Sequence, residues 1–91
     1  MLAEIKETII KRLKVSPVEI LASAVYGSWA KGIETRDSDI DLLLISDKIN
    51  PIRQKRGKEI ACIKEWLALN LPMDLLVLTP DECVSNFKNH N

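Results

Sequence analysis

Two aspartates stand at alternate positions where a strongly apolar run begins, and this pattern constrains the fold more than any other feature of the chain. The run is IDLLLI, residues 40–45, and the aspartates are Asp39 and Asp41. Such a run is typical of a buried strand. Because side chains alternate across a strand, both carboxylates share one face, with their Cα atoms roughly 6.5 Å apart. Two carboxylates on one face repel each other unless a cation lies between them, and hard oxygen ligands suit Mg²⁺.

A glycine–serine pair precedes these aspartates, and ten residues separate Gly27-Ser28 from Asp39. The apolar residues up to Tyr26 predict a strand that ends at Gly27, with a short helix from Ser28. A strand–glycine–helix junction presents unpaired backbone N–H groups and the positive end of a helix dipole. Glycine lets the backbone approach a ligand closely, and the Ser28 hydroxyl adds a donor. We therefore predict a phosphate cradle that faces the carboxylates; the alternative is an ordinary turn.

A third carboxylate, Asp74, interrupts the apolar run PMDLLVL, residues 72–78. It belongs either to the same site or to the exposed end of a strand. For Asp39 and Asp41 the alternative is that the acids cap a turn or face water. A phosphate cradle opposite a metal site with two carboxylates is the minimum apparatus for phosphoryl or nucleotidyl transfer. We therefore predict that all three aspartates serve one site.

The segment GSWAKG…DSDIDLLL carries a family resemblance. It resembles the nucleotidyltransferase superfamily typified by DNA polymerase beta, and is most similar to the minimal nucleotidyltransferase (MNT) group. The resemblance spans roughly residues 21–78. It implies two Mg²⁺ ions held by the three aspartates, with Asp74 also helping to deprotonate the acceptor hydroxyl. It further implies an ATP site formed by Gly27, Ser28 and Ser38.

The resemblance also implies a biological role, because MNT proteins act as antitoxins. They transfer AMP from ATP to a tyrosine of a HEPN-domain toxin. The chain stops about a dozen residues after its third carboxylate strand, so we expect another chain to supply the acceptor site. One rival hypothesis is a masking module that binds the partner without catalysis. Another is a nucleotidyltransferase that acts on a small molecule or an RNA end.

Length and composition indicate one small domain, residues 1–91, of which 46% is hydrophobic. The formal net charge is zero, so direct binding to nucleic acid is not expected. No apolar run approaches the roughly 20 residues of a membrane span, and the amphipathic N-terminus is not a signal peptide. Cys62 and Cys83 have neither CxxC nor zinc spacing, which favours a reduced pair in the cytoplasm.

The remaining periodicity predicts an α/β (α+β) fold, with a small mixed sheet backed by helices. Apolar residues at helical spacing predict a first helix over 2–13. Three X-Pro sites offer N-caps at Ser16, Asn50 and Thr79. After Ser16 there is room only for a turn. We expect a long helix from Asn50 to about residue 69, which Gly57 weakens, and a final helix over 80–87. The long helix has several candidates for its inner face, namely Ile52, Ile60, Ile63, Trp66 and Leu67.

Overall fold

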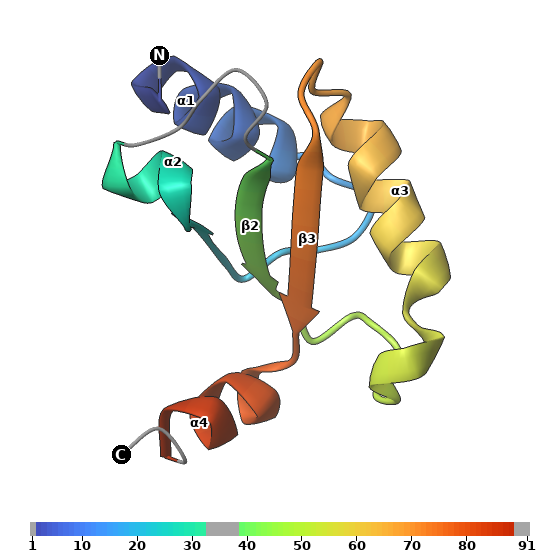
Figure 1. The fold of residues 1–91 in the computed structure, drawn as a ribbon. Helices are drawn as coiled ribbons and strands as arrows, with labels where there is room; N and C mark the ends of the chain where they lie inside the picture. Colours follow the sequence, from blue (N-terminus) through green and yellow to red (C-terminus); the bar gives the residue numbers. More distant parts are fainter. Residues whose placement is uncertain (1, 33–38, 89–91) are drawn as a thin grey trace.

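The computed structural model describes residues 2–32 and 39–88, which form a three-stranded sheet with helices on one face and at its ends (Figure 1). The elements in chain order are α1 (Leu2–Leu13), β1 (Ala22–Tyr26), α2 (Ser28–Lys31), β2 (Ile40–Ile45), a 3₁₀ turn η1 (Arg53–Lys55), α3 (Gly57–Leu67), β3 (Met73–Leu78) and α4 (Pro80–Lys88). The small mixed sheet backed by helices is therefore confirmed. In this part of the chain, no helix has both the length and the apolar character needed to cross a membrane.

The strand order is β1-β2-β3, with β2 in the centre. β1 runs antiparallel to β2, and β2 runs parallel to β3 because the chain returns to the same end of the sheet through α3. The register pairs Asp41 with Tyr26 on one side and with Asp74 on the other. The parallel pairing places both aspartates near the starts of their strands.

The hydrophobic core lies between one face of the sheet and the helices α1 and α3. On this face β2 contributes Ile40, Leu42 and Leu44, all almost completely buried. The helices cover them with Ile9 and Leu13 of α1 and Ile63 and Leu67 of α3. The opposite face, which we call the open face, carries the alternate residues and is partly exposed. Its members include Ala22, Ala24, Asp41, Leu43, Ile45 and Asp74.

The helix expected from Asn50 to about residue 69 is wrong in its first part. The Asn50 side chain accepts the N–H of Ile52 (2.9 Å) and so caps a turn. A 3₁₀ turn follows, and α3 begins only at Gly57. The break occurs at Arg56, whose side chain is buried although the residues before it are exposed.

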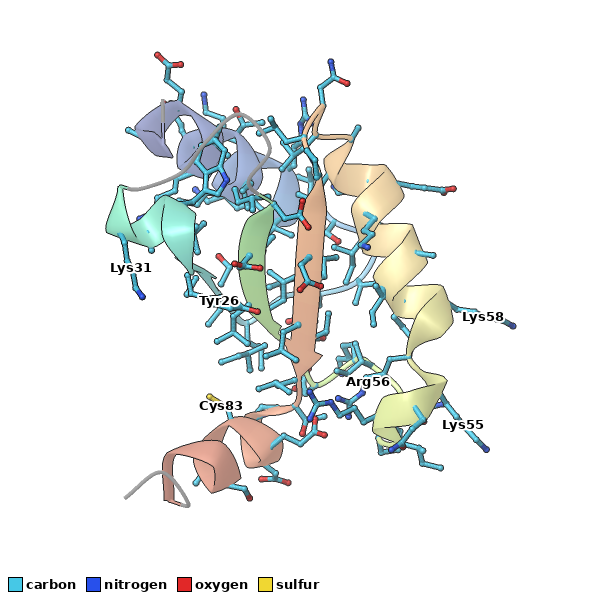
Figure 2. The ribbon with its side chains drawn as sticks, in the orientation of Figure 1. Tyr26, Lys31, Lys55, Arg56, Lys58 and Cys83 are labelled. Carbon is cyan, nitrogen blue, oxygen red and sulfur yellow. The ribbon has the colours of Figure 1, made fainter. Side chains whose placement is uncertain are left out.

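Arg56 explains the break because its guanidinium ties three parts of the fold together (Figure 2). It donates to the carbonyls of Asn50 (2.7 Å) and Val77 (3.1 Å), and pairs with Glu82 (2.7 Å). A buried cation needs such partners, since an unsatisfied one is strongly destabilising. A continuous helix from Asn50 would use the Asn50 carbonyl for its own bonding, whereas here that carbonyl accepts the Arg56 guanidinium.

The other predicted caps have mixed outcomes. Thr79 and Glu82 form the predicted capping box at the start of α4, with each residue's backbone N–H donating to the other's side chain. Ser16 makes only a turn, as expected, and accepts the N–H of Val18 (3.1 Å).

Two of the residues proposed for the inner face of the long helix lie outside the core. Ile52 and Trp66 are 48% and 41% exposed. The Trp66 indole donates to the carbonyl of Arg12 (2.7 Å), while the Arg12 guanidinium donates to the carbonyl of Leu67. These two bonds join the ends of α1 and α3 at the rim of the core, which explains why Trp66 stays half-exposed.

Candidate active site

Asp41 and Asp74 stand side by side on the open face of the sheet. They are register partners in neighbouring parallel strands, so their Cα atoms are roughly 5 Å apart. Asp41 is half-buried and Asp74 is exposed. Asp39 precedes β2 by one residue and is exposed. Water reaches this face, which lowers the cost of placing two like charges together.

Gly27 lies directly against the carboxylate of Asp41. A Cβ atom added to Gly27 would lie 2.2 Å from Oδ2 of Asp41, and the glycine has a φ of +73°. Both facts require glycine, because other residues avoid this backbone region and a side chain would collide with the carboxylate. The predicted cradle and the predicted metal ligand are therefore adjacent in space.

The start of α2 presents backbone donors next to these carboxylates. The carbonyl of Gly27 accepts the N–H of Lys31 (3.2 Å), which is the first helical bond. The N–H groups of residues 28–30 precede that bond and have no partner within the helix. Ser38, also predicted to bind the nucleotide, lies outside the described residues. Trp29 is buried in the core and packs there.

Tyr26 is a member of the site that the sequence analysis did not propose. Its Cα is paired with that of Asp41, and its side chain is 40% exposed on the open face (Figure 2). Partial burial, followed by the negative charges of Asp41 and Asp74, raises the pKa of Tyr26 above its ordinary value. The sequence contains a signal for this: alternation of side chains along β1 places Tyr26 on the open face, and Tyr26 immediately precedes Gly27.

The donor set fits a magnesium ion that takes its other ligands from substrate and water. The described residues contain no group of three or more His, Cys, Asp or Glu side chains arranged to hold one ion. Asp41 and Asp74 nevertheless supply two adjacent hard oxygen ligands, and Gly27 lies directly against the first of them. Mg²⁺ is usually bound by one or two carboxylates together with substrate phosphates and water. The residues present therefore fit such an ion.

Comparison with known proteins identifies a family and a similar fold. The family described as "Nucleotidyltransferase domain" matches residues 2–90. A crystal structure of a provisionally assigned nucleotidyltransferase from Sulfolobus solfataricus matches with a TM-score of 0.59 and 22% identity, over 93% of this chain and 72% of that chain. At this identity the likeness concerns the fold alone. Among curated proteins, no sequence matches significantly. The family match covers every residue from the first of α1 to the last of α4, and the chain belongs to the nucleotidyltransferase-domain family.

Proposed function

We propose that the protein is a Mg²⁺-dependent nucleotidyltransferase that moves AMP from ATP to a hydroxyl group. The observation that carries this proposal is the pairing of Asp41 with Asp74 directly beside Gly27. A carboxylate pair next to a glycine-lined phosphate cradle supports in-line attack on a nucleotide, because metal ligands and phosphate donors act on the same group.

Each residue has a distinct task in this proposal. Gly27 and Ser28 hold the β- and γ-phosphates through the backbone donors at the start of α2. Asp39, Asp41 and Asp74 would hold the Mg²⁺ ions, which supply charge stabilisation for the attacking and leaving oxygens. Asp74 also accepts the proton of the acceptor hydroxyl. The acceptor oxygen bonds to the α-phosphorus, the bond between this phosphorus and its bridging oxygen breaks, and pyrophosphate leaves.

We further propose a tyrosine of a HEPN-domain partner as the acceptor, so that the protein acts as an antitoxin. The support is the resemblance of residues 27–44 to MNT proteins and the exposure of the site. Asp74 lies on a sheet face that the described helices α1 and α3 leave uncovered. A group on the surface of another protein can therefore reach it. This step from site to biological role is an analogy.

The test uses α-labelled ATP, Mg²⁺ and the protein encoded by the neighbouring gene. Label is expected on a partner tyrosine, and Asp41→Asn or Asp74→Asn is expected to reduce it about a hundredfold or more, because catalytic charge stabilisation is lost. Asp47→Asn is the matched control. It makes the same change in charge at an exposed position beyond the far end of β2, and labelling should persist.

Two outcomes would contradict the proposal. Full labelling by Asp41→Asn would remove the carboxylate pair from the mechanism. Protection of a toxic partner by a variant in which Asp39, Asp41 and Asp74 are all Asn would favour the masking module. Transfer to a small molecule or an RNA end without a protein partner would contradict the proposed tyrosine acceptor but not the proposed nucleotidyl transfer.

A further inference from the structure

The edge strand β1 is only partly covered on its core-side face: Ser23 is exposed, and Val25 is half-buried and packs against the core. Its burial pattern is exposed at every position except Val25. A cavity of about 330 Å³ lies between α1 and β1. A second of about 150 Å³ adjoins it toward the start of β1, since Ile10 and Ser23 line both. We call these two adjoining cavities the edge groove.

The edge groove has an apolar floor and a basic rim. Ile10 is 49% exposed and lies between Lys6 and Lys14 in sequence. Both lysines line the groove: Lys6 lines the cavity that reaches Val25, and Lys14 lines the one that reaches back through Ala22 to Ile20. α1 therefore runs alongside β1 in the opposite direction. No acidic residue lines either cavity among the described residues.

The spacing along α1 matches that of an extended strand. Lys6, Ile10 and Lys14 follow one another at four-residue steps, and the N–H of Lys14 donates to the carbonyl of Ile10 (3.2 Å), so the helical turn continues to Lys14. Four helical residues advance about 6 Å, and two strand residues advance about 6.6 Å. A strand beside β1 can therefore present alternate side chains to these three residues in turn.

We propose that the β1 edge and this groove dock an extended segment of a partner protein that carries the pattern acidic-x-apolar-x-acidic. The segment adds a fourth strand to the sheet, and the outward N–H and C=O groups of β1 pair with its backbone. Its apolar side chain contacts Ile10 and Val25, and its two acidic side chains contact Lys6 and Lys14. This binding goes beyond nucleotidyl transfer and needs neither ATP nor the carboxylate site.

The charges around the edge groove disfavour a second copy of this chain as the segment that binds there. The β1 residues Ala22–Tyr26 include no acid. Antiparallel pairing of two β1 strands would also bring Lys6 of each copy toward Lys14 of the other, since α1 and β1 run in opposite directions. Like charges at such an interface suppress the association.

The experiment measures peptide binding to the ¹⁵N-labelled protein without ATP. The probe is a blocked heptapeptide, Thr-Glu-Thr-Val-Thr-Glu-Thr. One control peptide replaces both Glu by Lys. The other keeps the composition but moves one Glu by a residue, which places the two acids on opposite faces of the strand. We expect the probe to shift the amide signals of β1 and to bind about tenfold more tightly than either control.

Charge reversal supplies the decisive comparison. The double variant Lys6→Glu with Lys14→Glu should prefer the lysine peptide by a similar factor. Lys55→Glu with Lys58→Glu makes the same change in net charge on side chains that point away from the body, and should keep the wild-type preference (Figure 2). Equal binding of all three peptides, shifts confined to other elements, or absence of binding would overturn the proposal. So would a dimer that buries β1 without peptide.

Discussion

Replacing Gly27 by Ala should separate the stability of the fold from the geometry of the site, and Gly32 offers a matched control. Gly27 and Gly32 have nearly the same backbone conformation, with φ of +73° and +72°. Their surroundings differ. A Cβ on Gly27 meets Oδ2 of Asp41 at 2.2 Å, whereas a Cβ on Gly32 meets no atom of the described residues within 4 Å.

The magnitudes follow from this difference. An alanine in the left-handed region costs about 1–2 kcal/mol at either position, part of which is offset by the lower entropy of the unfolded chain. Each variant should therefore lower Tm by roughly 4–8 °C per kcal/mol lost. In Gly27→Ala the carboxylate must also retreat by about 0.8 Å to restore a 3.0 Å contact. A displacement of about 1 Å in a catalytic group can cost a hundredfold in rate.

The assay combines thermal unfolding with AMP transfer at saturating Mg²⁺ and ATP. We expect similar losses of Tm in the two variants, with transfer about a hundredfold lower in Gly27→Ala and within about threefold of wild type in Gly32→Ala. Equal activity in the two variants would refute the reasoning, because the contact with Asp41 would then have no catalytic consequence. A much larger loss of Tm in Gly27→Ala would show that Asp41 cannot move aside.

Two further predictions concern titration. Tyr26 is the chain's only tyrosine, so a titration followed by ultraviolet absorbance reports the raised pKa of Tyr26 alone. A bound divalent cation should lower this pKa, because its charge stabilises the tyrosinate. The titration uses Ca²⁺, since magnesium hydroxide precipitates in alkali. An unchanged titration would argue against a cation site. The N–H of Thr79, followed by Arg56, lowers the pKa of Glu82. Glu82 thus stabilises the fold above its ordinary pKa of 4.5 and less as the pH falls through the lowered value. Glu82→Gln should lower the free energy of unfolding, measured in urea, by about 1 kcal/mol at neutral pH. It should also make this free energy fall less steeply with pH in the acid range. An unchanged pH dependence in that range would contradict the prediction.

The strands and the small mixed sheet could be predicted because local patterns and the fold agree. Alternation placed Asp41 on a face opposite the buried residues of β2, and the structure keeps it there. The Thr79–Glu82 capping box is a local signal complete within four residues, and α4 begins where it predicts. Neither inference needed knowledge of distant contacts.

The prediction of the long helix was wrong because distant contacts, which the local sequence does not reveal, decide where α3 begins. Asn50 followed by proline is a legitimate N-cap signal, but the same side chain caps a turn equally well. The deciding contact is Arg56 with Val77 and Glu82, residues more than twenty positions away. A buried arginine cannot be recognised from helical periodicity, because the sequence signal of arginine is that of an exposed residue. Tyr26 was missed similarly, since its role depends on pairing with Asp41 across the sheet.

The site lies on the open face of the sheet, whereas the edge groove lies between α1 and β1, and this separation has a consequence for how a partner could use both. Tyr26 belongs to the open face, whereas Val25, the residue before it, lines the groove. Substitutions at Lys6 or Lys14 therefore leave the carboxylates untouched. A segment that pairs with β1 in the parallel direction ends level with Tyr26, so the residues that follow it in the partner can cross the sheet edge to the open face. Tethering of this kind raises the local concentration of an acceptor, often to the millimolar range for short linkers. An exposed site with weak affinity for an isolated tyrosine gains most from such an arrangement.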